Sequence, residues 1–332
     1  MQTMNRTAKR VPFKDRSRIL DAIGILLLLL GLSCAALGPA ELYCFYFFTE
    51  GGRFHYQGFG FGSFMFAFIA VQIVGYYVIA FLCIPLGYGH LRLRRWARTL
   101  SLAGLGFWFI MGVPLVITFL AILVLAKDMS MVTVLAMLPL MALLYPVLPA
   151  VLTRFYRSRD VKLTFEARDP KSYWTEQLPS AIWVLCFLLT FWIIALHLAI
   201  LLRGAFPLFG MLVTELPGIL LLDASILVVA ALTWGTFRLQ VWAWWGAVAY
   251  FCVLTLSTIS TFLRLGWSDI LDALKFAPLE ANALAGVPIR GIHLAAFFGV
   301  PLAATLGCII YSKRFFAPIP DTQDARLRHP QP

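Results

Sequence analysis

Eight apolar stretches, each about as long as a lipid bilayer is thick, limit the folds open to this chain more than any other feature. A helix needs about 20 apolar residues to cross the hydrocarbon core, and the interval between Arg53 and Arg92, for example, contains no charged residue. The stretches are apolar on all sides rather than in alternation, so they predict spanning helices and not barrel strands. We place the spans at residues 19–40, 64–86, 101–126, 131–152, 180–202, 208–234, 244–263 and 292–312.

The composition agrees with a lipid environment. Hydrophobic residues make up 61% of the 332 residues and charged residues only 13%, whereas a soluble domain carries about 25% charged residues. The sequence therefore predicts an all-α polytopic membrane protein with eight transmembrane helices.

The net charge of +11 is distributed asymmetrically. If the N-terminus lies inside, all but six of the 27 Lys and Arg residues fall on the inner side, as is usual for cytoplasmic segments. We therefore expect both termini to be cytoplasmic, in a prokaryotic cytoplasmic (inner) membrane, and the inner surface to bind anionic lipid headgroups rather than nucleic acid. The six residues expected outside are Arg53, Lys127, Arg203, Arg264, Lys275 and Arg290.

A short motif occurs twice, 146 residues apart. Residues 86–97 read LGYGHLRLRRWA and residues 232–243 read LTWGTFRLQVWA. In each copy a glycine ends a span, an arginine lies at the depth of lipid phosphates and a tryptophan follows in the interfacial belt. The motif predicts two parallel four-helix repeats, with interfacial anchors at Arg92, Trp96, Arg238 and Trp242.

The repeats define the expected domain boundaries. The first transmembrane half covers residues 19–156 and the second covers residues 180–316. A polar linker at residues 157–179, with a turn signal at Asp169-Pro170, joins them on the cytoplasmic side. Cytoplasmic tails occupy residues 1–18 and 317–332.

Two carboxyl groups fall inside the sixth predicted span. Ionisable residues within a bilayer are costly and mark functional sites. Asp223 lies near the middle of this span, and Glu215 lies eight residues earlier. Pro217 lies between them and is expected to kink the helix, because it removes a helical hydrogen bond. We therefore expect a polar cavity in the second half, with Pro217 as its hinge.

Neighbouring spans offer partners for these acids. His197 lies near the outer end of the fifth span and is expected at the depth of Glu215. Thr255 and Thr258 recur at helical spacing in the seventh span, and their hydroxyl groups can solvate a buried carboxyl group. In the alternative interpretation, Asp223 is protonated and has only a structural role, because desolvation favours the neutral acid.

Two functions remain open on this basis. The first is translocation of an ion, a proton or a small solute through the polar cavity. The alternative is a non-catalytic membrane subunit or scaffold of a larger complex. The sequence contains no HExxH, GxSxG or Walker A motif, so an enzyme is the less favoured reading.

The last span carries small residues at four-residue intervals, which allow another helix to approach closely. They serve packing within the chain or, alternatively, a homodimer interface. The stripe consists of Ala295, Gly299, Ala303 and Gly307.

No cofactor is predicted. His197 and His293, both near the outer side, leave haem or copper ligation as an alternative, and no metal-binding cysteine pair is present. In the last outer loop, Ser268 is expected to cap a short helix, with Asp269 in its first turn.

Overall fold

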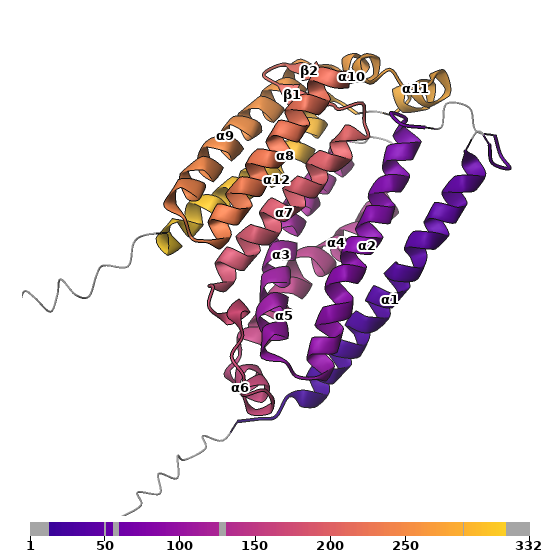
Figure 1. Cartoon of the computed structure of the whole chain (residues 1–332). Coiled ribbons are helices and arrows are strands. Elements are labelled where there is room, and N and C mark those ends of the chain that lie inside the picture. Colours follow the sequence, from indigo (N-terminus) through magenta and orange to yellow (C-terminus); the bar gives the residue numbers. More distant parts are fainter. Residues whose placement is uncertain (1–12, 50, 56–59, 126–130, 288, 317–332) are drawn as a thin grey trace, which may run out of the picture. The chain divides into compact units, whose positions relative to one another are not determined.

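The computed structural model describes residues 13–49, 51–55, 60–125, 131–287 and 289–316. Eight helices in this part are long and apolar enough to span a membrane, which confirms the predicted number of spans. The chain is therefore a multi-pass membrane protein. The spans are α1 (Ser17–Phe48), α2 (Phe64–Leu91), α3 (Arg95–Leu125), a composite fourth span, α7 (Ser180–Ile200), α8 (Glu215–Phe237), α9 (Val241–Arg264) and α12 (Gly291–Tyr311) (Figure 1).

The fourth span is not a continuous α-helix. It consists of α4 (Met131–Ala142), a π-helical turn η1 (Leu143–Val147) and α5 (Leu148–Arg157). Pro146 lies within the π-turn, and a proline cannot donate the backbone hydrogen bond that a regular α-helix needs. Both predicted tails and residues 126–130 lie partly or wholly outside the described residues.

The chain divides into two compact units. The first unit is Met1–Ser180 with Lys275–Gly286, and the second is Ala181–Leu274 with Val287–Pro332. The predicted linker at residues 157–179 belongs to the first unit. Its helix α6 (Arg159–Arg168) places Val161 and Phe165 in a hydrophobic core with Leu20, Leu93, Leu105 and Tyr156.

In the first unit α1 and α2 pack along their length (Figure 1). Gly24, Gly31 and Gly38 follow one another at seven-residue intervals and are all buried. A Cβ atom on Gly31 would lie 2.7 Å from Ile84 Cγ1, so the two backbones approach closely only because this residue has no side chain.

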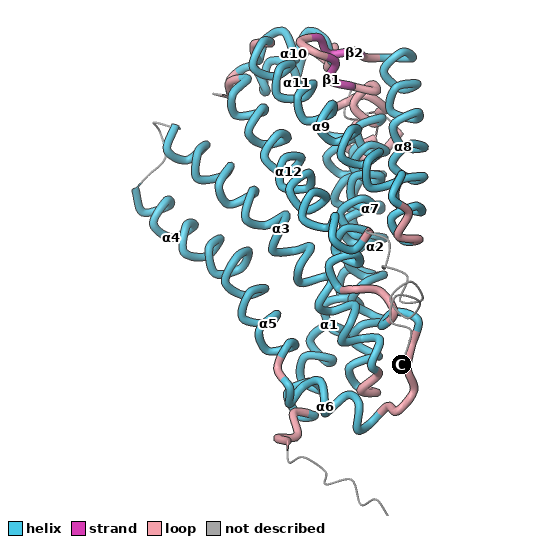
Figure 2. The backbone as a smooth tube through the Cα atoms, turned by 90° about the vertical axis from the view of Figure 1, so that its left-hand side faces the viewer, coloured by secondary structure: helices cyan, strands magenta, loops and turns pink. Residues whose placement is uncertain are grey.

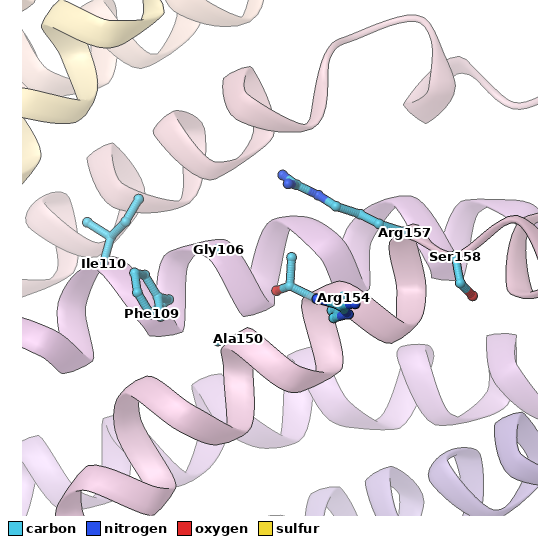
Figure 3. A pocket seen from close by; sticks show the side chains of 8 residues that line it. Gly106, Phe109, Ile110, Ala150, Arg154, Arg157 and Ser158 are labelled. Carbon is cyan, nitrogen blue, oxygen red and sulfur yellow. The ribbon is translucent and has the colours of Figure 1, made fainter.

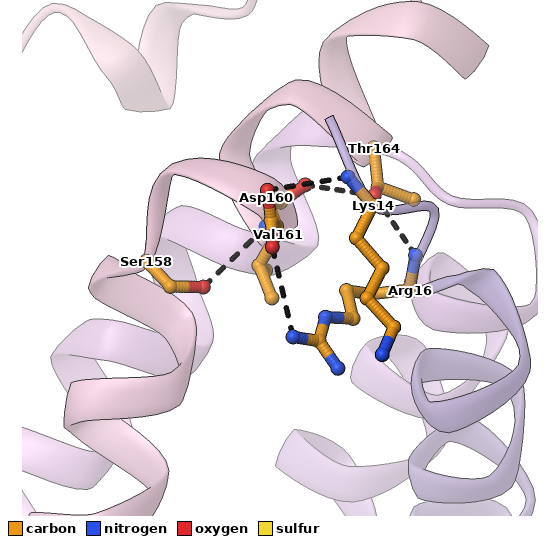
Figure 4. A network of polar contacts seen from close by, with 6 residues as sticks. All are labelled: Lys14, Arg16, Ser158, Asp160, Val161 and Thr164. Carbon is orange, nitrogen blue, oxygen red and sulfur yellow. Dashed lines mark hydrogen bonds and ion pairs between the residues drawn. The ribbon is translucent and has the colours of Figure 1, made fainter. Parts of the chain in front are cut away.

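A polar network ties the start of α1 to α6 (Figure 4). The Asp160 carboxylate accepts a hydrogen bond from the Lys14 amide (3.3 Å) and pairs with the Arg16 guanidinium (3.6 Å). The Arg16 amide donates to Thr164 Oγ1 (3.2 Å). The N-terminal helix is thus anchored to the segment that the sequence suggested was a linker.

In the second unit, a small β-hairpin lies in the connection between α7 and α8 (Figure 2). Strands β1 (Phe206–Leu208) and β2 (Met211–Val213) pair antiparallel. Phe209 and Gly210 connect them with positive φ angles of 41° and 96°, as a tight hairpin turn requires. The prediction that the sixth span begins at residue 208 was therefore wrong, and α8 begins at Glu215.

Two short helices follow α9. In α10 (Trp267–Leu274) the apolar residues Ile270, Leu271 and Leu274 are buried. Ser268 lies inside this helix, so the expected cap at this residue was wrong. The Asp269 carboxylate instead accepts from the Gly266 amide (2.8 Å).

Helix α11 (Pro278–Ala285) belongs to the first unit and caps the N-terminus of α2. Its buried Glu280 accepts hydrogen bonds from the amides of Phe64 and Met65, both at 3.1 Å. Ser63 Oγ accepts from the Phe66 amide (3.1 Å). The Ser63 amide donates to the Gly60 carbonyl (3.0 Å), so all four N–H groups that a helix start leaves unpaired are satisfied.

Candidate functional site

Asp223 is the ninth residue of α8, roughly 12 Å from its start at 1.5 Å per residue. Its side chain is exposed, whereas Leu222 and Ser225 are buried. Asp223 thus lies in the interior of α8, and its side chain faces out of the unit. This position does not match the interior cavity that the sequence suggested.

The exposed face of α8 follows a regular pattern. Its members recur at alternating intervals of four and three residues, which places them on one seam of a helix that can pack against another helix. Asp223 is the one charged member of this α8 seam. The seam consists of Leu216, Leu220, Asp223, Leu227, Ala230 and Trp234, all exposed.

Glu215 and Pro217 lie in the first turn of α8 rather than in the interior of the span. Glu215 is exposed, has a positive φ of 62°, and donates its amide hydrogen to the Arg203 carbonyl oxygen (2.6 Å). Pro217 is in the first turn, where a missing N–H group costs no helical hydrogen bond. The geometry for the predicted mid-helix kink is therefore absent at this residue, and α8 continues through Phe237.

The hydroxyl groups of α9 point into the second unit. Thr255 and Thr258 are both buried, and Thr255 Oγ1 donates to the Phe251 carbonyl of its own helix (2.6 Å). Ser257 and Thr261 hold the hairpin: Ser257 Oγ accepts from the Phe209 amide (2.9 Å) and donates to the Pro207 carbonyl (2.8 Å). Thr261 Oγ1 accepts from the Gly210 amide (2.9 Å). The hydroxyl groups of Thr255, Ser257 and Thr261 therefore have backbone partners.

The two histidines of the haem alternative lie in different environments. His197 is exposed, with Nδ1 2.7 Å from the Ile193 carbonyl oxygen. His293 is buried, and its Nδ1 accepts from the Arg290 amide (3.1 Å) at the start of α12. Among the described residues, no group of three or more His, Cys, Asp or Glu side chains is arranged to hold a metal ion.

The two copies of the repeated motif have the same backbone structure. Leu93 and Leu239, each the second residue after its helix, have positive φ angles of 47° and 55°. Arg94 N donates to Gly89 O (2.7 Å), and Gln240 N donates to Gly235 O (2.9 Å). Both turns are Schellman motifs, and the next helix begins at the equivalent residue, Arg95 in α3 and Val241 in α9.

The side chains of the motif also match. A Cβ on Gly89 would lie 2.9 Å from the Trp96 ring, and one on Gly235 would lie 2.8 Å from the Trp242 ring. The guanidinium carbon of Arg92 lies 5.9 Å from the Tyr88 ring centre. In the second copy, Arg238 lies 4.7 Å from the Trp234 ring centre. Because the glycine has no side chain, the tryptophan ring packs directly against it. The glycine therefore has this role in addition to its position at the end of a helix.

The small-residue stripe of α12 divides into two parts. Ala295 and Gly299 are buried, and a Cβ on Gly299 would lie 2.6 Å from Ile259 Cγ1 of α9. Ala303 and Gly307 are exposed, and a Cβ on Gly307 would meet no atom within 4 Å. The first part serves packing within the unit, while the second part leaves the homodimer alternative open.

The sequence analysis missed a buried polar pair in the first unit. His90 is fully buried at the end of α2, with Nε2 2.6 Å from the Tyr156 hydroxyl oxygen and Nδ1 2.7 Å from the Leu86 carbonyl oxygen. Arg98 Nε donates to the Tyr156 carbonyl (3.0 Å). The sequence did contain a signal for this pair. His90 is a polar residue within the repeated motif, at the position equivalent to the buried Thr236.

The loop after α6 carries a second charged cluster. Arg95 pairs with Glu176 (2.8 Å), and Arg94 pairs with Asp169 (3.6 Å). Partial desolvation and the neighbouring Asp169 carboxylate raise the pKa of the Tyr173 hydroxyl. These contacts balance two of the basic residues within the first copy of the motif, Arg94 and Arg95.

No known protein family, curated protein or solved structure matches this chain in sequence or fold.

Proposed function

We propose that the chain is a non-catalytic membrane subunit that binds another transmembrane helix along the α8 seam, with Asp223 as the specifying contact. The observation that carries this proposal is an exposed carboxyl group in the middle of a spanning helix. An acidic residue near the centre of a bilayer costs about 2.5–3.5 kcal/mol on insertion scales. A partner that pairs with the group would offset this cost.

The seam has the form of a helix-packing surface. Its apolar members Leu220 and Leu227 are 60% and 71% exposed, and Asp223 lies between them at the same spacing. A single polar residue in such a seam fixes the register and the choice of partner. The pattern thus favours recognition of one specific helix over general contact with lipid.

The charge of Asp223 indicates the kind of partner. Every Lys and Arg within the eight spans lies in the first or last four residues of its span. Within the described spans, neither this chain nor a second copy of it therefore offers a lysine or arginine at the depth of Asp223. We infer a different chain, whose transmembrane helix places a Lys, Arg or His side chain opposite this carboxylate.

Photo-crosslinking in the native membrane tests the proposal. A photoreactive residue at Leu220 or Leu227 is expected to form one adduct with a second membrane protein, and the same residue at Leu256 of α9, which is 59% exposed, is expected to form none. Asp223→Asn should lower the adduct yield about tenfold, which corresponds to about 1.4 kcal/mol. Asp223→Glu should retain most of it.

Three outcomes would contradict the proposal. They are an adduct between two copies of this chain, adducts with lipid alone, and a yield that Asp223→Asn does not change. Translocation of an ion or solute remains a prediction, and the exposure of Asp223, Glu215 and His197 does not favour a buried relay among them.

We further propose that the chain consists of two parallel four-helix repeats with both termini in the cytoplasm of a prokaryotic cell. A duplication is supported by two features that recur 146 residues apart. They are the Schellman turns and the packing of a tryptophan ring against a glycine. If the halves are parallel, Arg92 and Arg238 lie on the same side of the membrane.

Cysteine labelling tests this topology. Arg92→Cys and Arg238→Cys are each expected to react with a membrane-impermeant maleimide only after permeabilisation. Native Cys44, which is exposed near the opposite end of α1, should react in intact cells and serves as the internal comparison. Labelling of one introduced cysteine from outside and the other only from inside would overturn the parallel arrangement.

A further inference from the structure

A groove runs between α3 and α5 in the first unit and has a volume of about 760 Å³ (Figure 3). This volume falls within the range of about 300–1,000 Å³ that is usual for small-molecule sites. Its lining comes from one face of each helix, at intervals of three and four residues. The lining includes Phe109, Ile110, Ala150, Thr153, Arg154 and Arg157.

The groove is apolar along most of its length and basic at one end. Arg154 and Arg157 occupy the last turn of α5, where the fourth span ends. Phe109 and Ile110 lie on α3, and Figure 3 shows their side chains and the two guanidinium groups around the same opening. The distance along α5 from Ala150 to Arg157 is roughly 10 Å. A ligand that fills this groove must therefore combine an apolar chain with an anionic head.

The ion pairs of the first unit distinguish these two arginines from their neighbours. Arg95 pairs with Glu176, Arg94 with Asp169 and Lys162 with Glu166 (3.8 Å). Among the described residues, no carboxylate pairs with Arg154 or Arg157. Two positive charges at the end of an apolar groove are thus available for an anion that is not part of this chain.

We propose that the α3–α5 groove binds an anionic phospholipid, with the phosphate between Arg154 and Arg157 and an acyl chain against Phe109, Ile110 and Ala150. The position of the arginines at the end of a span matches the depth of lipid phosphates. Arginine binds phosphate through paired N–H donors. This proposal does not depend on the partner helix at Asp223.

Lipid binding to the purified full-length protein tests the proposal. Native mass spectrometry in detergent compares phosphatidylglycerol with phosphatidylcholine of the same acyl chains. The unsubstituted protein should retain phosphatidylglycerol preferentially. Arg154→Gln with Arg157→Gln should weaken this binding about 30-fold, because both guanidinium groups lose their charge-assisted hydrogen bonds to the phosphate.

A matched control removes the same charge elsewhere in the first unit. Arg168→Gln with Lys171→Gln changes two exposed basic residues that lie outside the spans and do not line the groove, and it should alter binding less than twofold. Ala150→Phe leaves both arginines in place but fills the apolar part, and it should weaken phosphatidylglycerol binding at least tenfold. Circular dichroism and the elution volume verify that each variant is folded.

Inorganic phosphate is the probe for a free anion. It should not displace phosphatidylglycerol at a hundredfold molar excess. If phosphate displaces the lipid and Ala150→Phe has no effect, the groove is a site for a free anion and the proposal is wrong. Equal losses in the two double variants would also overturn it, because general surface charge would then explain the binding.

Discussion

Replacement of Glu280 by alanine is expected to lower the free energy of unfolding by about 2–4 kcal/mol. The Glu280 carboxylate is buried and accepts hydrogen bonds from the amides of Phe64 and Met65. Loss of an acceptor costs about 1–3 kcal/mol for each buried donor left unpaired, and two donors are involved here. The positive end of the α2 dipole also loses its favourable charge.

Chemical unfolding in detergent and hydrogen exchange of individual amides measure this effect. The amides of Phe64 and Met65 should exchange faster in Glu280→Ala. Glu280→Gln, which keeps an oxygen acceptor but loses the charge, should have an intermediate effect. Asp272→Ala, at an exposed acid of α10, should change stability by less than about 0.5 kcal/mol. Unchanged exchange at Phe64 would refute the assigned role of Glu280.

Alanine at Gly89 or Gly235 is expected to destabilise the protein by about 2 kcal/mol in each case. A Cβ atom at these positions would lie 2.7 Å from the Ala97 Cβ and 2.4 Å from the Ala243 Cβ, respectively. The tryptophan ring and the next helix must shift to accommodate it, and such overpacking costs about 1–3 kcal/mol. Similar losses at the two sites would support the equivalence of the two motifs.

Gly75→Ala provides the matched control in a spanning helix. A Cβ atom on Gly75 would meet nothing within 4 Å, so the higher helix propensity of alanine should stabilise the protein by up to about 1 kcal/mol. The same unfolding measurement compares all three variants. If Gly75→Ala and Gly235→Ala had equal effects, the close packing at Gly235 would not matter for stability.

The positions of the spans could be predicted from the sequence because length and hydropathy are local properties. The prediction failed at residues 208–214, where Leu208, Met211, Leu212 and Val213 are as apolar as a spanning helix. These residues form a hairpin, and Ser257 and Thr261 of α9 satisfy the backbone groups of its turn. Hydropathy alone does not separate these two outcomes, because it does not report which groups satisfy the backbone hydrogen bonds.

The depth of Asp223 could be predicted, but the direction of its side chain could not. A helix that is apolar on all faces contains no periodic signal for its rotation about its own axis. The rotation of α8 is set by packing, since Gly218, Leu222, Ser225 and Val229 are buried. Residues such as Thr255, expected near the carboxyl group, are turned toward the interior of the unit for the same reason.

Contacts between distant residues were inaccessible to the sequence analysis. Glu280 and Phe64 are 216 positions apart, and neither residue belongs to a local motif. The His90–Tyr156 pair joins the second and fourth spans, which the third span separates in the sequence. In contrast, the repeated motif could be predicted because its glycine, arginine and tryptophan all act within twelve consecutive residues.

The position of Glu280 has a consequence for the biosynthesis of the protein. The ribosome starts α2 at Phe64, 216 residues before it reaches the acid that pairs with the first amides of that helix. Until then, the start of α2 lacks two of its final hydrogen bonds, and water or another protein must satisfy these donors. A nascent chain that stops before α11 therefore contains an N-terminal unit that has not reached its mature state.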